Sequence, residues 1–199
     1  MKSRLTAILL AAACAHAAGC GGAAVRGDPV AAPQVDVAAL FARALAAQES
    51  GNADRAQTLW REVIAAAPTQ AAPHTNLGIV HRHAGRIDEA IREYQAAITL
   101  DPRDARAYHN LGVAQRARGA WTEAERAYLR AVELRPEQAD SHYNLAVLYE
   151  VFLNRPEDAL THYRAVVSLG GSDADLVAPW VKALERRLAA PNGAAGGAP

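Results

Sequence analysis

The hydrophobic, small and polar positions of this chain recur with a period of 34 residues. Residues 108–112 (YHNLG) match residues 74–78 (HTNLG), which lie 34 positions earlier, and residues 142–146 (HYNLA) follow 34 positions later. The second half of the unit keeps the same step, because Gly85, Ala90, Tyr94, Ala97 and Pro102 recur as Gly119, Ala124, Tyr128, Ala131 and Pro136. Self-similarity at a fixed period of this size is typical of repeat architectures.

Each unit predicts two antiparallel helices. Small residues recur where two helix backbones must approach, a glycine stands where the first helix can end in a left-handed conformation, and a proline follows the second helix. We therefore expect packing roles, and no ligand role, for Leu77, Gly78, Ala90, Tyr94 and Ala97.

The order of an aromatic residue, leucine-glycine, a turn glycine, a small residue, an aromatic residue, alanine and a closing proline resembles the tetratricopeptide repeat, and residues 71–138 fit it twice. The resemblance implies an all-α fold, a right-handed α-α superhelix of about four helix-turn-helix repeats. The expected units are 37–70, 71–104, 105–138 and 139–172. The first departs from the pattern at Arg43, where leucine is usual, and the last needs one extra residue near Asn154 to bring Ala159 and Tyr163 into phase.

A further helix is predicted over residues 173–190. Its apolar residues recur at helical spacing, with charged residues between them, which indicates an amphipathic helix that caps the last repeat. These apolar residues are Leu176, Val177, Trp180, Val181, Leu184 and Leu188.

The first 19 residues have the order of an export signal. Lys2 and Arg4 precede a short apolar run and small residues, and that run is too short to span a bilayer. Residues 17–20 (AAGC) resemble the bacterial lipobox, which implies that Cys20 is lipidated and becomes the first mature residue. Cys14 after three alanines is a competing site, and an ordinary signal on a soluble periplasmic protein is the other alternative.

Residues 20–36 are expected to form a flexible tether and residues 191–199 a disordered tail, since both are rich in glycine, alanine and proline. Both cysteines lie in the leader region, so no disulfide is expected in the folded part.

Composition supports helices and argues against nucleic acid as a partner. Hydrophobic residues make up 51% of the chain but aromatic residues only 6%, which suits close-packed helices better than a β-sandwich. Basic and acidic residues are equal in number at 21 each, so there is no basic excess to attract a phosphate backbone. Loss of the leader, which removes Lys2 and Arg4, leaves a charge of about minus two.

In the family that the chain resembles, the first helices line a concave groove faced by repeat positions 2, 5, 6, 9, 12 and 13. Position 6 holds Asn76, Asn110 and Asn144, a ladder of amides that can donate to and accept from an extended peptide backbone. Asparagine is also simply common at this position in the family. Apolar contact is expected from Ile79, Val113 and Tyr143.

The middle of the predicted groove is positive. Position 12 holds Arg82 and Arg116, and Arg106 and His109 add further donors. Arginine pairs well with carboxylates through its planar fork, so an acidic segment or a free C-terminus is one expected ligand. A solvated charged face is the alternative. The lysines of the family's best-known carboxylate-binding pattern are absent from positions 2 and 5.

No catalytic, metal or cofactor site is predicted, and no small-molecule substrate. His81 and His83 are two residues apart on a helix and point in different directions, without an acidic residue at ligand spacing. The chain has no G-x-S-x-G motif, phosphate loop or Cys-His arrangement.

The resemblance implies a membrane-anchored adaptor or assembly factor of the bacterial cell envelope, similar to tetratricopeptide lipoproteins that serve secretin and pilus assembly, gliding motility or peptidoglycan-enzyme complexes. A chaperone-like periplasmic holder of exported polypeptides is the alternative. Because Gly21 and not aspartate follows Cys20, the outer membrane is the preferred location, with the protein facing the periplasm.

Overall fold

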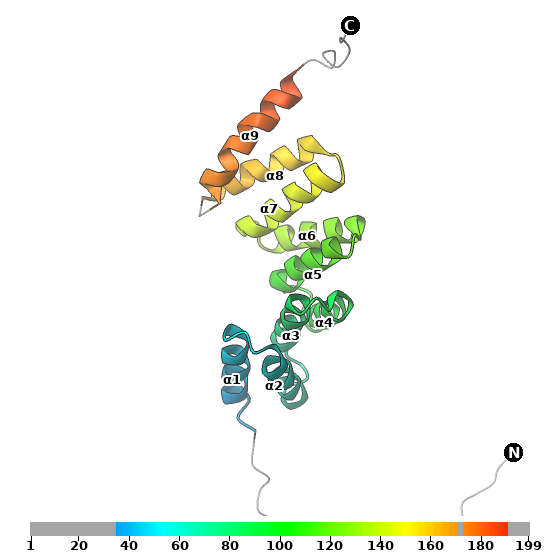
Figure 1. The fold of residues 1–199 in the computed structure, drawn as a ribbon, viewed down its shortest axis with the longest axis vertical. Helices are drawn as coiled ribbons and strands as arrows, with labels where there is room; N and C mark the ends of the chain where they lie inside the picture. Colours follow the sequence, from blue (N-terminus) through cyan, green and yellow to red (C-terminus); the bar gives the residue numbers. More distant parts are fainter. Residues whose placement is uncertain (1–34, 171–172, 191–199) are drawn as a thin grey trace, which may run out of the picture. The chain divides into compact units, whose positions relative to one another are not determined.

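The computed structural model describes residues 35–170 and 173–190, and every regular element in them is a helix. The helices follow one another along the chain as four hairpins and a final helix (Figure 1), in the order α1 (Val37–Glu49), α2 (Ala53–Ala66), α3 (Ala71–His83), α4 (Ile87–Leu100), α5 (Ala105–Ala117), α6 (Trp121–Leu134), α7 (Ala139–Val147), η1 (Leu148–Phe152), α8 (Pro156–Leu169) and α9 (Ala174–Ala189). Each helix packs on the next, and α3 also contacts α5. The prediction of an all-α solenoid is confirmed.

Three of the four hairpin turns depend on a glycine in the left-handed conformation. Gly51, Gly85 and Gly119 have φ of 75°, 74° and 80°, which side chains with a Cβ rarely adopt. In the second hairpin the amide of Arg86 donates to the carbonyl of His81 at 2.9 Å and the amide of Gly85 donates to Arg82 at 3.0 Å. This is the Schellman pattern that satisfies the last carbonyls of a helix.

The fourth hairpin turns differently because it contains one more residue. A five-residue π-helix, η1, continues α7, and Asn154 takes the left-handed conformation at φ 51° where the other turns have glycine. The amide of Arg155 reaches back six residues to the carbonyl of Tyr149 at 2.8 Å, whereas Arg86 reaches back five. The wider π-turn therefore absorbs the extra residue that the sequence indicated near Asn154.

The core of each hairpin is built around one aromatic side chain of its second helix. Trp60, Tyr94, Tyr128 and Tyr163 are at most 2% exposed. A Cβ on Gly78 would lie 2.5 Å from the Tyr94 ring. A Cβ on Gly112 would lie 2.6 Å from the Tyr128 ring. The close approach of the two helices thus requires the absence of a side chain at these positions.

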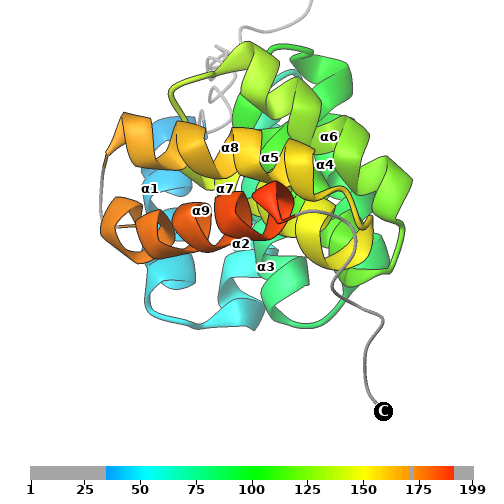
Figure 2. The ribbon, with the colours of Figure 1, turned by 90° about the horizontal axis from the view of Figure 1, so that it is seen from above.

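Helix α9 packs along α8 (Figure 2) and closes the last core cluster. Val177 and Leu184 are buried in that cluster, and Val181 and Leu188 are packed against it. Leu176 is 57% exposed and Trp180 is 39% exposed, although Trp180 still contacts the rings of Tyr143 and Tyr163. The helix covers the fourth hairpin with part of its apolar surface.

The predicted export signal at 1–19, the predicted lipidation site Cys20, the predicted tether up to residue 34 and the predicted tail at 191–199 lie outside the described residues. Within residues 35–170 and 173–190, none of the helices has both the length and the apolar character needed to cross a membrane.

We predict that Gly78→Ala lowers the free energy of unfolding by about 1–3 kcal/mol, because the new methyl group overpacks the Tyr94 ring. Urea denaturation followed by circular dichroism measures the loss. Gly78→Ala combined with Tyr94→Leu should cost clearly less than the two single changes added together, since the smaller side chain makes room for the methyl. Additive costs would contradict the proposed close contact.

Candidate functional site

The ten predicted groove residues all lie on the first helices of the hairpins, α3, α5 and α7. We call the surface formed by positions 2, 5, 6, 9, 12 and 13 of α1, α3, α5 and α7 the A-helix face. On it Arg106 is exposed. Two residues are buried, Asn76 at 2% and Asn110 at 8% exposure. The others are half-buried, namely Arg82, Arg116, His109, Tyr143, Asn144, Ile79 and Val113.

The asparagine side chains are already engaged within the protein. The amide nitrogens of Asn110 and Asn144 donate to the carbonyls of Arg106 and Asp140, four residues earlier, at 2.9 Å each. The Oδ1 atom of Asn76 accepts from the Arg106 guanidinium at 2.6 Å. Asn76 and Asn110 therefore do not form the open amide ladder expected from the sequence, because helix packing covers them and their own helix or the next one takes up their polar atoms.

The arginines of the A-helix face bridge neighbouring repeats. Arg106 on α5 donates back to Asn76 on α3, and Arg116 on α5 points forward to Asn144 on α7 at 3.5 Å. Arg82 contacts the His83 ring at 3.1 Å. These contacts hold the guanidinium groups on the face without neutralising them.

None of these three arginines has a carboxylate within ion-pair distance among the described residues. Seven other arginines do have one, at 2.6 to 3.9 Å: Arg118, Arg126, Arg130, Arg135, Arg155, Arg164 and Arg187. Seven further arginines also have none among the described residues: Arg43, Arg55, Arg61, Arg86, Arg92, Arg103 and Arg186. What sets Arg82, Arg106 and Arg116 apart is that they lie together on the A-helix face, where their guanidinium groups can bind an external anion.

Two tyrosine hydroxyl groups lie beneath the arginines. The side chains of Tyr94 and Tyr128 are fully buried, and in the described part of the protein their hydroxyl oxygens have no hydrogen-bond partner. Burial raises the pKa of each phenol to about 12, although the neighbouring Arg82 or Arg116 acts in the opposite direction. Each hydroxyl remains protonated at neutral pH, covered by the protein beneath a guanidinium group.

In the first and last repeats, too, the residue at position 12 lies beside the buried aromatic residue of the second helix. In the first hairpin the indole nitrogen of Trp60 donates to Gln48 at 2.9 Å. In the fourth hairpin, burial raises the pKa of Tyr163, and the neighbouring Glu150 raises it further. Glu150 also accepts a hydrogen bond from Arg187 at 2.9 Å. Position 12 therefore faces the buried aromatic residue of its own repeat, a pairing that the repeat alignment contained but that we did not predict.

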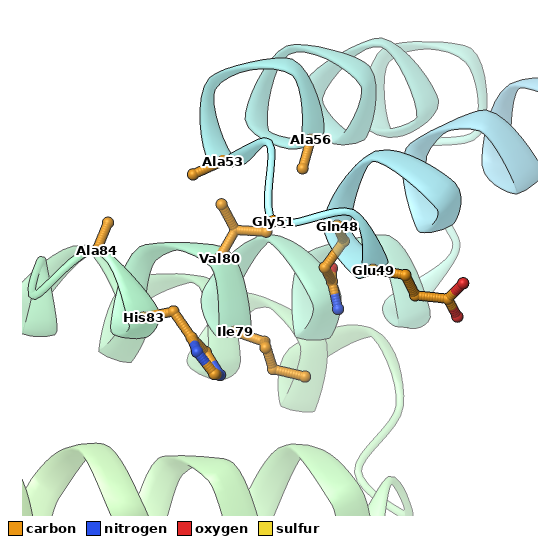
Figure 3. A pocket seen from close by; sticks show the side chains of 9 residues that line it. All are labelled: Gln48, Glu49, Gly51, Ala53, Ala56, Ile79, Val80, His83 and Ala84. Atoms are coloured by element: carbon orange, nitrogen blue, oxygen red, sulfur yellow. The ribbon is translucent and has the colours of Figure 1, made fainter.

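A cavity of about 400 Å³ opens between the first two hairpins (Figure 3). Gln48 and Glu49 at the end of α1, Gly51 in the turn, Ala53 and Ala56 at the start of α2, and Ile79, Val80, His83 and Ala84 on and after α3 line it. The predicted site residue Ile79 thus belongs to a hollow and not to a flat surface. The cavity could not be predicted from the sequence, because an alanine of α2 that lines a cavity and one that packs against another helix have the same spacing along the chain.

The histidines have structural partners. The His81 ring is buried and accepts from the Arg86 side chain at 2.9 Å, and burial lowers its pKa. His109 contacts the Ser141 hydroxyl at 2.9 Å, and burial lowers its pKa against the influence of Asp140. Within the described residues, no three histidine, cysteine or acidic side chains gather in a way that could hold a metal ion.

His142 on α7 and His162 on α8 form a close pair within the fourth hairpin. Nδ1 of His142 lies 3.0 Å from Nδ1 of His162, and Nε2 of His142 lies 3.0 Å from the carbonyl of Pro136. Since Nε2 must donate to the carbonyl, Nδ1 of neutral His142 accepts from His162. Burial and then His142 lower the pKa of His162 to about 4, while Asp158 acts in the opposite direction.

We predict that this pair destabilises the protein as the pH falls from about 6.5 to about 4. The unfolded chain takes up the His162 proton near pH 6.5 and the folded protein only near 4, so the contribution is full above 6.5. Because the ring is only half-buried and solvent screens its interactions, the loss amounts to on the order of 2 kcal/mol. Urea denaturation at a series of pH values measures it. His162→Gln keeps a donor to His142 without titrating and should flatten the slope, whereas an unchanged slope would show that the pair does not set it.

Comparison with known proteins gives matches over most of the hairpins. Residues 80–116 and 114–150 match a family model described as TPR repeat, and residues 38–69 match one described as tetratricopeptide repeat. No curated protein matches the chain.

Several solved structures share the fold. The pilF protein of Pseudomonas aeruginosa is 23% identical, with a TM-score of 0.68 over 76% of this chain and 68% of that one. YrrB, described as a TPR protein with an unusual peptide-binding site, is 20% identical, with a TM-score of 0.62 over 74% of this chain and 75% of that one. MamA from Desulfovibrio magneticus RS-1 is 26% identical, with a TM-score of 0.61 over 67% of this chain and 75% of that one.

Proposed function

Because the chain belongs to the tetratricopeptide repeat family, we propose that it is a protein-protein interaction adaptor that binds an acidic segment of its partner on the A-helix face. We further propose that a lipid on Cys20 holds it at the bacterial cell envelope, facing the periplasm, with the outer membrane as the preferred location. Candidate machines are those of secretin and pilus assembly, gliding motility and peptidoglycan synthesis.

The observation that carries the binding proposal is the uncompensated charge of Arg82, Arg106 and Arg116. Their guanidinium groups lie on adjacent helices beside amide, imidazole and phenol groups, without a carboxylate at ion-pair distance among the described residues. A carboxylate from a partner would add the charge-assisted, bidentate hydrogen bonds that arginine geometry favours.

Burial of two of the three asparagines favours the adaptor over the chaperone-like holder. A holder of many unrelated chains would depend on free backbone-binding amides, but Asn76 and Asn110 are covered and hydrogen-bonded. The exposed chemistry of the face is charge and apolar side chains. Such a surface selects a partner by its side chains.

The anchoring proposal is supported by the sequence of the leader. Two basic residues, a short apolar run and the AAGC segment before Gly21 stand in the order that lipid attachment at Cys20 requires. A lipidated cysteine with several acyl chains would give durable anchoring, since two or more chains bind a bilayer firmly.

We predict that Arg82→Glu with Arg116→Glu lowers affinity for the native partner at least tenfold, about 1.4 kcal/mol, because each change places an acid against the partner's acids. A crosslinked pull-down from native membranes identifies the partner and quantifies its loss. Arg126→Glu with Arg130→Glu on α6 is the matched control, since it changes the net charge equally but removes arginines already paired with Glu123 and Glu133.

Thermal unfolding of the variants separates binding from folding, because Arg82 and Arg116 are half-buried. Arg82→Lys with Arg116→Lys keeps the charge and should retain more binding than the glutamate variant. Equal partner recovery by wild type and the folded Arg82/Arg116 glutamate variant would rule out the A-helix face as the binding surface.

Cys20→Ala should release the protein from the membrane fraction, because it removes the proposed acylation site. Cell fractionation with immunoblotting measures this release, and metabolic labelling with a clickable fatty acid detects the lipid directly. Cys14→Ala is the matched control and should leave both signals intact. Loss of labelling with Cys14→Ala, and not with Cys20→Ala, would assign the lipid to the other cysteine.

A further inference from the structure

We propose that the cavity between α1, α2 and α3 receives an apolar side chain of the partner, so that the bound segment is bipartite, with large apolar residues at one end and carboxylates at the other. This inference rests on the proposed function and specifies the chemistry of the partner. The cavity formed by α1, α2 and α3 would bind the apolar end of the partner segment, and the arginines on α3 and α5 would bind its acidic end.

The cavity has the size and walls of an apolar binding pocket. Its volume of about 400 Å³ falls within the range of pockets that bind ligands, and exceeds what one leucine side chain needs. Ala53, Ala56, Ile79 and Val80 form apolar walls (Figure 3). Transfer of a leucine or phenylalanine from water to such a site is favourable enough to increase affinity tenfold or more.

The cavity belongs to the same surface as the arginines. Gln48, Ile79 and His83 occupy positions 12, 9 and 13 of their repeats, which are positions of the A-helix face. Arg82 stands directly before His83 on α3. Ile79 and His83 lie about 6 Å apart along the helix axis at 1.5 Å per residue, so one short segment can fill the cavity and reach the Arg82 guanidinium.

The charge of the face changes sign across these helices. Glu49, at the end of α1, is an exposed acid at the rim of the cavity. Arg82 follows on α3, and Arg106 and Arg116 follow on α5. A carboxylate of the partner is repelled near α1 and attracted near α3 and α5, which places the apolar end of the segment at the cavity.

The spacing of the helices sets the spacing of the acids. Because α3 and α5 are in contact, their axes are separated by about 8–10 Å. A polyproline II segment has three residues per turn and rises about 3.1 Å per residue, so residues three apart lie on one side and about 9 Å from each other. Two acids three residues apart therefore match the spacing of the helices that carry Arg82 and Arg116.

The test uses fluorescence polarisation with the full 199-residue chain carrying Cys20→Ala, which removes the lipid. The probes are fluorescein-labelled proline-rich peptides with two adjacent leucines, a short spacer and two glutamates three residues apart, made with the leucines at either end. Matched probes replace both leucines by alanine, or both glutamates by glutamine. Ala53→Phe and Ala84→Phe each place a ring at the cavity from an exposed position, and Ala53→Ser leaves it open.

For one of the two peptide orientations, the leucine probe should bind the otherwise unmodified full chain at least tenfold more tightly than the alanine probe. That preference should disappear in Ala53→Phe and Ala84→Phe and persist in Ala53→Ser. Arg82→Glu with Arg116→Glu should weaken the leucine and alanine probes by the same factor.

Equal affinity for the leucine and alanine probes would overturn the proposal that the cavity receives an apolar side chain. A preference for leucine that persists in both phenylalanine variants would overturn it as well. If binding still requires the glutamates and the two arginines, that outcome leaves the proposed function standing. Absence of binding by every probe, or binding that does not change when the glutamates are replaced, would overturn both proposals, the apolar side chain in the cavity and the acidic segment on the A-helix face.

Discussion

The packing of one aromatic ring against a residue without a side chain controls both the fold and the candidate site. Tyr94 lies against Gly78, and Tyr128 lies against Gly112, so the two helices of each central hairpin can approach closely. The same rings carry their hydroxyl groups to the A-helix face beneath Arg82 and Arg116. Core packing and the placement of the arginines therefore depend on one contact that is repeated every 34 residues.

Differences between repeats give the face its direction. Position 12 changes from Gln48 to Arg82, Arg116 and Glu150, while the buried aromatic residue behind it is kept. Gln48 is taken up by the Trp60 indole and Glu150 by Arg187 from α9. The two ends are thus satisfied internally, and the central arginines keep their positive charge for a partner. A solenoid can change its surface in this way because each repeat packs mainly on its neighbours.

The sequence predicted the fold well because its period reports packing directly. Positive φ at Gly51, Gly85 and Gly119 and burial of Tyr94 and Ala97 follow from residues that the alignment singled out. The extra residue near Asn154 appeared as a π-turn, since a shift of phase must be absorbed somewhere in the helix. These features are local, and one repeat contains all the information they need.

The site was predicted less completely because it depends on contacts between repeats. The Oδ1 atom of Asn76 is taken up by Arg106, 30 residues further along the chain, and packing between helices covers the side chain. The cavity beside Ile79 requires alanines of α2 to lie opposite α3, and no single repeat contains that information. The repeat positions correctly predicted which helices form the face. The burial of its residues, their ion pairs and the cavity depend on how the repeats pack together and are seen only in the structure.

Site-specific photocrosslinking in intact cells shows whether a partner binds on the A-helix face. A benzoylphenylalanine at Val113, half-buried on the A-helix face, is compared with one at Arg126, which is exposed on α6. Binding on the A-helix face predicts a crosslinked partner from position 113 and little or none from position 126. A partner captured from position 126 and not from position 113 would contradict binding on the A-helix face.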